Sequence, residues 1–238
     1  MKSRRIGGAM QVDFLVISPH PDDAEYAVAG SVARWISEGK QVVYVICTNG
    51  DKGTSDRHIK PEELAVTREK EQIAAAEILG VQKVVFLRYP DQSLENTPEF
   101  RKELVRQIRT FRPKTVITSD PYRRYIWHRD HRITGRAALD AVFPCARDHL
   151  AFPGLLEQGL EPHKVEEVLC WAAEDINCRL DITDTFDLKL AALRAHDSQV
   201  GNRPHPEFEQ HLRKRYAELA EGEEYALAEA FHRVVLPE

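Results

Sequence analysis

Histidine and aspartate residues follow an apolar run near the start of the chain. The segment Ser18-Pro19-His20-Pro21-Asp22-Asp23 places one imidazole and two carboxylates within four positions. The preceding run Phe14-Leu15-Val16-Ile17 predicts a short buried strand, and open α/β sheets bind their ligands at the carboxyl ends of strands. Zinc and related first-row cations are bound by histidine and aspartate side chains. The segment therefore predicts a divalent-metal site.

A second cluster of the same residue types lies about a hundred residues later. Trp127-His128-Arg129-Asp130-His131 follows the apolar run Thr115-Val116-Ile117-Thr118 after a short loop. In the usual doubly wound strand order, the first and fourth strands are neighbours that flank the topological switch point. A catalytic zinc site has three protein ligands and one open position. We therefore expect the two clusters to meet at one sheet edge and to share a metal.

The spacing within each cluster divides the side chains by role. His20 and Asp23 are three residues apart, so they lie on one face if a helix starts after Pro21, and they can share a metal. Asp22 then points elsewhere and remains a free carboxylate, as a general base for water requires. His128 and His131 have the same spacing, and either can supply the third ligand while the other faces the substrate.

Simpler interpretations exist for each motif taken alone. The segment at 18–23 would be a turn with an aspartate N-cap, and the histidine pair would be a solvated helix start. The segment at 50–53 resembles a phosphate-cradling turn, but it lacks P-loop and dinucleotide spacing, so we interpret it as a turn near the site. The joint occurrence of the two histidine clusters favours the metal site.

Strand and helix patterns alternate through the first two thirds of the chain, which predicts βαβ units and a parallel sheet. The predicted strands are 12–18, 41–48, 83–88 and 114–119, and the predicted helices between them are 24–38, 61–80 and 97–111. Beyond them we expect strands at 165–171 and 180–182, a helix at 183–196, and a charged helical tail at 207–231.

The segment 143–163 differs from its surroundings because it holds three prolines and two glycines with little periodicity. Such composition predicts an irregular insertion or a lid beside the site. The whole chain of 238 residues is expected to form a single domain, since α/β domains commonly reach this length.

The composition limits the partners and the compartment. A formal charge of -5 gives no indication of nucleic-acid binding, which usually requires an excess of basic residues. No apolar run has the length of a membrane span. The basic amino terminus is followed by an interrupted apolar segment without a cleavage site, so no signal peptide is expected. Four cysteines without a C-x-x-C pair argue against a disulfide framework and a thiolate zinc site, and they predict free thiols in a reducing cytoplasm.

These motifs resemble the LmbE-like, or PIG-L, family of zinc-dependent N-deacetylases. The hallmarks of that family are an H-P-D-D string after the first strand and a later H-x-x-H, here His20 to Asp23 and His128 to His131. The supporting matches are spread over most of the chain: Thr48-Asn49-Gly50-Asp51, Arg68-Glu69, Leu79-Gly80, 189–199 and Ala228-Glu229-Ala230-Phe231.

The resemblance implies a Rossmann-like, three-layer αβα fold with a mostly parallel central sheet. It also implies zinc, or another first-row divalent metal such as Fe²⁺, held by His20, Asp23 and His131. Asp22 would be the general base, and a protonated His128 would stabilise the oxyanion. Trimers and hexamers are common in the family, so a homo-oligomer is expected.

Other site residues are also expected from the resemblance. Asp130 is placed to orient His128, and Arg68 matches a substrate-contacting arginine, with a buried Arg68–Glu71 pair as the structural alternative. We further expect Asp91, Tyr125 and His196 among the substrate-binding residues, although His196 could equally serve packing or a subunit contact. The chain departs from the commonest family pattern at Ala29, Arg129, Gln92 and in the spacing of Tyr125 from His128.

The predicted function is removal of an N-acetyl group from an N-acetylglucosamine-type amino sugar or sugar conjugate. A metal-dependent phosphoesterase is one alternative, but it would usually need a second metal and more carboxylates than Asp22 and Asp130. A noncatalytic sugar-binding protein is the other, since such a fold need not be an enzyme, yet a binding site would not need Asp22.

Overall fold

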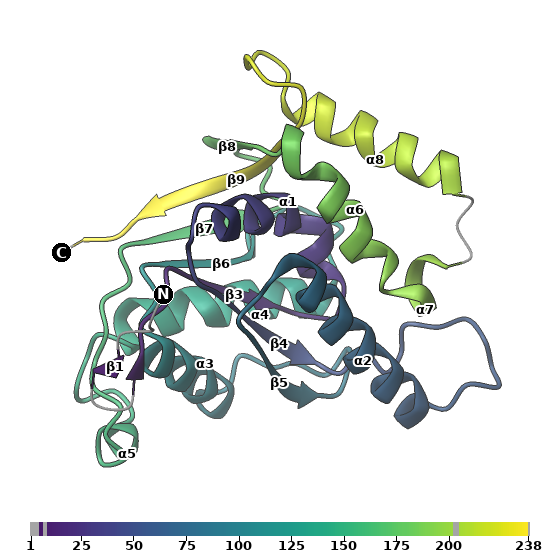
Figure 1. Ribbon diagram of the computed structural model, residues 1–238. Coiled ribbons are helices and arrows are strands. Elements are labelled where there is room, and N and C mark those ends of the chain that lie inside the picture. Colours follow the sequence, from purple (N-terminus) through teal and green to yellow (C-terminus); the bar gives the residue numbers. More distant parts are fainter. Residues whose placement is uncertain (1–4, 7–8, 202–204, 238) are drawn as a thin grey trace.

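The structure is a computed structural model that describes residues 5–6, 9–201 and 205–237 (Figure 1). Its centre is a seven-stranded sheet in the order β5-β4-β3-β6-β7-β9-β8. The strands are β3 (Phe14–Ser18), β4 (Val42–Thr48), β5 (Lys83–Tyr89), β6 (Thr115–Ser119), β7 (Glu167–Trp171), β8 (Cys178–Asp181) and β9 (Ala228–Val235). A separate antiparallel pair is formed by β1 (Arg5–Ile6) and β2 (Ala9–Met10).

The sheet is mostly parallel, as the alternating pattern predicted. β5, β4, β3, β6 and β7 pair in parallel, and only β9 runs against its neighbours β7 and β8. All seven residues of β4 are buried, as expected for a strand covered on both faces. β3 lies between β4 and β6, so the first and fourth predicted strands are indeed neighbours.

Helices cover both faces of the sheet, which confirms the three-layer αβα prediction. On one face Leu15 and Ile17 pack with α3 (Pro98–Phe111) and α4 (Arg129–Asp140). On the other face Val16 packs with α1 (Asp23–Ser37), α2 (Pro61–Leu79) and α6 (Phe186–Arg194). Neighbouring residues of β3 thus face opposite layers, because side chains alternate along a strand.

The carboxyl-terminal region departs from the sequence-based prediction. The helix expected at 207–231 ends much earlier, since α8 spans His205–Leu219 and the last part forms β9. Charged residues in β9 hid the strand pattern, although its burial alternates toward the end. The helix expected at 183–196 is also divided, into η2 (Thr183–Thr185) and α6, followed by α7 (Asp197–Val200).

The segment 143–163 packs against α3. It contains the end of η1 (Ala141–Cys145) and the short α5 (Pro153–Leu156). The buried guanidinium of Arg109 on α3 donates hydrogen bonds to carbonyls at 145, 146, 148 and 151. The site pocket described below has no lining residue from this segment. A lid role for 143–163 therefore stays a prediction without a contact to that pocket.

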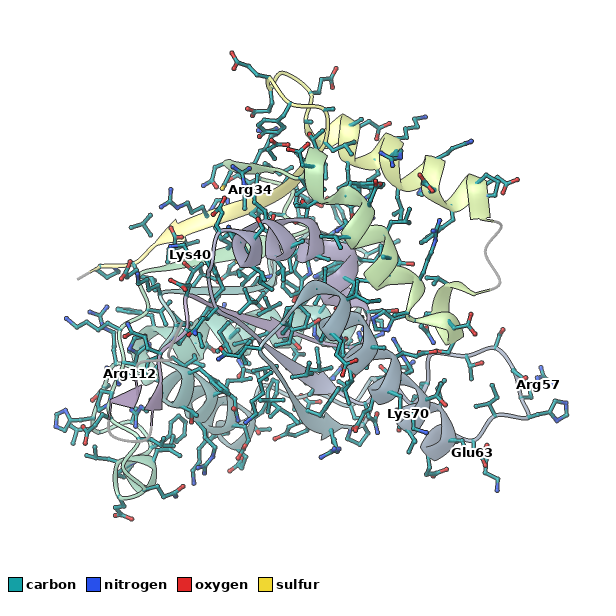
Figure 2. All side chains as sticks on the ribbon, in the orientation of Figure 1. Arg34, Lys40, Arg57, Glu63, Lys70 and Arg112 are labelled. Carbon is teal, nitrogen blue, oxygen red and sulfur yellow. The ribbon has the colours of Figure 1, made fainter. Side chains whose placement is uncertain are left out.

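The surface carries charges of both signs. Glu63 and Lys70 project from the first half of α2, and Arg57 projects from the loop before it (Figure 2). Within the part of the chain that the structure describes, no helix combines the length and the apolar composition that crossing a membrane requires.

Candidate active site

Three side chains from the two histidine clusters converge at the carboxyl edge of the sheet. Asp23 Oδ2 lies 2.9 Å from His20 Nδ1 and 3.0 Å from His131 Nε2. His20 follows β3, Asp23 opens α1, and His131 lies in the first turn of α4. The Ser119 hydroxyl at the end of β6 donates a 2.6 Å hydrogen bond to the His131 carbonyl and fixes that turn. Neighbouring strands thus bring together the three predicted ligands.

The close approach of α4 to β6 depends on a glycine. A Cβ atom at Gly135 would lie 2.1 Å from the Ser119 carbonyl oxygen, far inside contact distance. Only a residue without a side chain lets this helix approach the strand end so closely. Gly135 therefore helps to set the position of His131, one turn earlier on α4.

The residue types of this set are those that bind first-row divalent cations. Ligand atoms about 2.0 to 2.2 Å from a tetrahedral metal lie roughly 3 to 3.5 Å from one another, close to the separations around Asp23 Oδ2. Without a cation, charged neighbours hold the group together. Burial raises the pKa of Asp23. The charge of His131 and the hydrogen bonds from both histidines have a larger, opposite effect, so the pKa lies well below its usual range. The chemistry of the donor set thus matches a metal site.

Carboxylates also surround the far side of the His20 ring. His20 Nε2 lies 3.0 Å from Asp91 Oδ1 and 3.4 Å from Asp130 Oδ2. Burial lowers the pKa of His20, but hydrogen bonds with Asp130, Asp23 and Asp91 raise it well above its usual value. A carboxylate on the second ring nitrogen orients a metal-binding histidine and increases its basicity. Asp91 is thus a partner of the His20 ring, and its predicted contact with substrate stays a prediction.

Two groups of side chains bring three potential ligand atoms within 4.8 Å of one another, and neither group includes Asp23. One group joins His128 to His20 and His131, and the other is His20 with Asp91 and Asp130. The second is explained by hydrogen bonding to the His20 ring. The first offers His128 as a ligand in place of Asp23, and metal analysis of variants can separate the two sets.

Asp22 directly precedes the predicted ligand Asp23, and its carboxylate contacts Arg68. Its backbone lies in the left-handed region at φ 94°, and its amide donates to Gln72 Oε1 at 3.1 Å. Aspartate tolerates this region better than most residues. Burial and the charge of Asp23 raise the pKa of Asp22 to about 7, against the opposing effect of Arg68. The carboxylate is therefore engaged by Arg68, and its role as a base apart from the ligands stays a prediction.

Arg68 on α2 holds Asp22 in place. Its Nη2 atom lies 3.3 Å from Asp22 Oδ2, and its guanidinium donates to the carbonyls of Pro21 and Gly50. A Cβ atom at Gly50 would lie 2.4 Å from the guanidinium, so glycine makes room for it. Glu71 binds the amide and hydroxyl of Ser198 rather than Arg68. The predicted substrate contact of Arg68 stays a prediction, and the alternative Arg68–Glu71 pair is wrong.

His128 caps the start of α4 and lies next to the other two histidines. Its ring centroid is 4.7 Å from that of His20 and 5.5 Å from that of His131. Its Nδ1 atom accepts a 3.2 Å hydrogen bond from the Asp130 amide, so the proton of a neutral ring lies on Nε2. Burial and the positive charges of His20 and His131 lower the pKa of His128.

This geometry corrects the role predicted for Asp130. Its backbone amide orients His128, whereas its carboxylate accepts a 2.6 Å hydrogen bond from the Gln92 amide and faces His20. Burial and the charges of His20 and His131 lower the pKa of His128 by more than the charge of that carboxylate raises it. The sequence could not show this, because side-chain direction at a helix start depends on the loops that pack against it.

Two further residues predicted to contact substrate do not line the pocket described below. Tyr125 is 92% exposed on the loop before α4 and does not line the pocket. His196 is fully buried, and its Nε2 atom lies 3.2 Å from Glu25 Oε2. Glu25 also accepts from Gln72, which in turn accepts from the Asp22 amide. His196 therefore belongs to a buried network behind Asp22, in agreement with the packing alternative.

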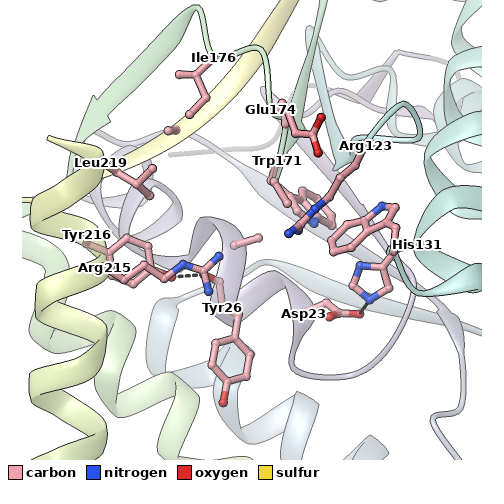
Figure 3. A pocket seen from close by; sticks show the side chains of 15 residues that line it. Asp23, Tyr26, Arg123, His131, Trp171, Glu174, Ile176, Arg215, Tyr216 and Leu219 are labelled. Carbon is pink, nitrogen blue, oxygen red and sulfur yellow. Dashed lines mark hydrogen bonds and ion pairs between the residues drawn. The ribbon is translucent and has the colours of Figure 1, made fainter. Parts of the chain in front are cut away.

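A pocket of about 550 Å³ opens beside Asp23 and His131 (Figure 3). Its walls come from α1, the loop at 121–127, the end of β7 and α8. The large polar and aromatic side chains that line it are Tyr26, Arg123, Trp127, Trp171, Glu174, Arg215 and Tyr216. The aromatic and basic composition of 120–127 signalled part of this wall. Arg215 was missed because it is one of many charges on α8.

The fold and the site together define a class of protein. A Rossmann-like sheet carries a cluster of histidine and aspartate side chains at its carboxyl edge, with a further carboxylate held by an arginine and a pocket alongside. These are the parts of a metal-dependent hydrolase.

Comparison with known proteins agrees with this class. The family model described as GlcNAc-PI de-N-acetylase, PIG-L, matches residues 15–142. A diacetylchitobiose deacetylase of Thermococcus kodakarensis is 38% identical over 192 residues, which cover 78% of this chain and 69% of that protein. A probable N-acetyl-alpha-D-glucosaminyl L-malate deacetylase 2 of Bacillus anthracis is 29% identical over 79% of this chain and 82% of its own length.

The structure of N,N'-diacetylchitobiose deacetylase from Pyrococcus horikoshii, solved with an inhibitor, is similar throughout. It superposes with a TM-score of 0.89 at 32% sequence identity, over 94% of this chain and 84% of that one. The chain belongs to the PIG-L family, as the H-P-D-D and H-x-x-H motifs predicted.

Proposed function

We propose that the chain is a metal-dependent amidohydrolase that removes the N-acetyl group from an N-acetylglucosamine-type amino sugar or sugar conjugate. The observation that carries this proposal is the arrangement around α1, where Asp23 contacts both histidines while Asp22 is held off them by Arg68. The deacetylase relatives from three organisms support the choice of bond and sugar.

The metal would be held by His20, Asp23 and His131, and zinc is the ion we propose, with Fe²⁺ as the alternative. A bound divalent cation would polarise the acetamide carbonyl and lower the pKa of a water molecule. Asp91 and Asp130 orient the His20 ring from the opposite side.

Asp22 is the proposed general base. It takes a proton from the attacking water as the water oxygen bonds to the carbonyl carbon, and the proton then passes to the amine nitrogen as the C–N bond breaks. Acetate and a free amino sugar are the products. Arg68 fixes the carboxylate in position.

His128 is the proposed oxyanion stabiliser. With its Nδ1 atom accepting from the Asp130 amide, its Nε2–H is the group available to donate to the developing oxyanion. The neutral ring can serve this purpose, so the imidazolium that the family resemblance implies is not required. Trp127 and Tyr26 supply flat apolar surfaces in the pocket for a sugar ring.

The direct test is amine release from a panel of N-acetylated sugars by protein loaded with zinc and by protein treated with a chelator. We expect release by the loaded protein and less than about 1% of that rate after chelation. Hydrolysis of phosphate esters instead of amides would favour the phosphoesterase alternative. Binding of the sugars without any release would favour the sugar-binding alternative.

We also propose a single domain over residues 1–238, a homo-oligomer and a cytoplasmic location. One sheet that includes both β3 and β9 supports the single domain. Free thiols at all four cysteines support a reducing compartment. The trimer or hexamer rests on the family resemblance, and sedimentation of the purified chain tests it.

A further inference from the structure

The pocket beside the metal site continues to a second wall that the catalytic residues do not use. Asp23 and His131 lie at one end, and Arg215 and Tyr216 of α8 lie at the other (Figure 3). Arg123, from the loop before α4, reaches into the pocket from the wall opposite Arg215. Two guanidinium groups therefore border the space next to the proposed reaction centre.

An aromatic ring lies behind each of these guanidinium groups. The Arg123 Cζ atom is 4.7 Å from the centroid of Trp127, and the Arg215 Cζ atom is 6.0 Å from that of Tyr216. A guanidinium that packs over a ring keeps its N–H edge free to donate in its own plane. The rings thus limit the movement of both cations and leave their donors available.

The charges of the two arginines are not neutralised by ion pairs. Neither Arg123 nor Arg215 has a carboxylate within 4.0 Å among the described residues, as the ion pairs of the chain show. Arg213 on the same helix differs, since it pairs with Asp187 at 2.8 Å and with Glu209 at 3.1 Å.

One other carboxylate, Glu174, also lines the pocket. It is paired with Arg124 at 2.7 Å on the exposed side of the loop. The charge of Glu174 is therefore balanced by Arg124, and the Asp23 carboxylate is paired with His20 and His131. The part of the pocket beyond the metal site carries an excess of positive charge.

We propose that Arg123 and Arg215 form a subsite for an anionic group, a carboxylate or a phosphate, on the part of the substrate beyond the acetamido sugar. Guanidinium groups bind both anions through paired N–H donors. The pocket volume of about 550 Å³ leaves room for such a group beside a sugar. The inference rests on the proposed deacetylase function and makes the preferred substrate an acidic glycoconjugate rather than a neutral disaccharide.

The test compares three substrates that differ only in the aglycone. They are the methyl, carboxymethyl and 2-phosphoethyl glycosides of N-acetylglucosamine, each as both anomers. We expect the zinc-loaded enzyme to deacetylate at least one acidic glycoside with a kcat/KM about 10- to 100-fold above that of the methyl glycoside. The two acidic arms distinguish carboxylate from phosphate.

Substitution of the arginines tests the assignment to these residues. Arg215→Gln and Arg123→Gln should each remove most of the acidic preference by raising KM, with kcat/KM for the methyl glycoside changed less than about threefold. Arg215→Lys should restore part of the preference. Arg213→Gln is the matched control on α8 and should leave all three substrates unaffected, since its guanidinium is engaged elsewhere.

The possible failures are distinguishable. Equal kcat/KM for neutral and acidic glycosides, or an acidic preference that survives both glutamine variants, would overturn the subsite while leaving the deacetylase function intact. If no glycoside releases amine, the function is wrong, and calorimetric binding of the carboxymethyl glycoside to wild type and Arg215→Gln still decides the subsite. Equal affinity of the two proteins for that glycoside would reject it.

Discussion

Two buried clusters of charge lie near α1, and they are completed in different ways. In the first, Lys189 and Glu229 are both fully buried and 2.6 Å apart. Lys189 Nζ donates to Glu229 and to the carbonyls of Glu25 and Tyr26. The second cluster contains His20, Asp22, Asp23 and their partners, and it opens on the pocket.

The first cluster is closed because every charge and proton in it has a partner. The three protons of the Lys189 ammonium are all donated, and Glu229 accepts from the amides of Gly30 and Ser31 as well. In a regular helix the amide of Gly30 donates to the carbonyl of Tyr26. Here Glu229 accepts from that amide and Lys189 donates to that carbonyl, so the ion pair contacts both partners of one helical turn of α1. Such a cluster holds a helix in place.

The second cluster has more acceptors than donors. Four carboxylates, those of Asp22, Asp23, Asp91 and Asp130, meet around two histidine rings and Arg68. The buried atoms Asp130 Oδ1 and His131 Nδ1 have no hydrogen-bond partner in the described part of the chain. The comparison teaches that a balanced buried cluster maintains structure, whereas an excess of carboxylate at the mouth of a pocket provides a place for a cation.

The largest expected effect comes from removing a proposed ligand from the open cluster. His131→Ala should lose both bound metal and nearly all amine release, because two side chains cannot replace a three-ligand site. Metal content by elemental analysis and activity should be measured on the same sample. His128→Ala is the control and should lose activity while it retains metal. Loss of metal from His128→Ala would instead favour the ligand set that includes His128.

Removing the base should separate chemistry from metal binding in the same cluster. Asp22→Asn keeps the shape of the side chain but cannot accept the proton, so kcat should fall about 10²- to 10⁴-fold with metal content unchanged. Stopped assays of amine release at saturating substrate measure this. Full activity of Asp22→Asn would reject the assignment of the base.

Breaking the closed cluster of Lys189 and Glu229 should lower the stability of the protein. Lys189→Met leaves the Glu229 carboxylate buried without its cation, and the free energy of unfolding should fall by about 3 to 5 kcal/mol. Urea denaturation monitored by circular dichroism measures the loss. Lys189→Met/Glu229→Gln should recover part of it, since the amide oxygen can still accept from the backbone of α1. No recovery in the double variant would contradict the closed-pair interpretation.

The smallest expected effect concerns His196, which connects the region behind Asp22 to Glu25. Burial lowers the pKa of His196, but the hydrogen bond and charge of Glu25, with smaller contributions from Asp22 and Glu71, raise it above its usual value. A raised folded-state pKa stabilises the protein below the unfolded-state pKa of about 6.5, and this stabilisation is lost as the pH rises through the folded value.

The stability difference between wild type and His196→Gln should therefore be larger at pH 6 than at pH 9. Urea denaturation midpoints across that pH range measure this stability difference. Lys189→Met, which retains every histidine, is the control. A difference that grows with pH would show that His196 is neutral in the folded protein.

The sequence predicted the parts of this molecule that depend on local pattern. Alternation of strands and helices gave the parallel sheet, and the position of His20 and His131 after neighbouring strands predicted their meeting. Both inferences hold because parallel strands place their carboxyl ends at one edge. The choice of Asp22 as the carboxylate apart from the predicted ligands also follows from local helix geometry.

The remainder depends on contacts between distant segments, which spacing does not show. Asp91 reaches His20 only because β5 ends beside β4. Tyr125 resembles a site residue by its place in the chain, yet the loop turns it outward. Arg215 lines the pocket because α8 forms one of its walls, and the helix predicted over β9 is wrong because the charges of that strand mask its alternation of buried residues.

The position of β9 has a consequence for how the protein is made. β9 is synthesised after all the other strands, yet it lies in the interior of the sheet, between β7 and β8. Glu229 on this strand also neutralises Lys189 beneath α1. A nascent chain must therefore keep a gap in its sheet and an unpaired ammonium beneath α1 until β9 has emerged from the ribosome, so completion of the sheet waits for this strand.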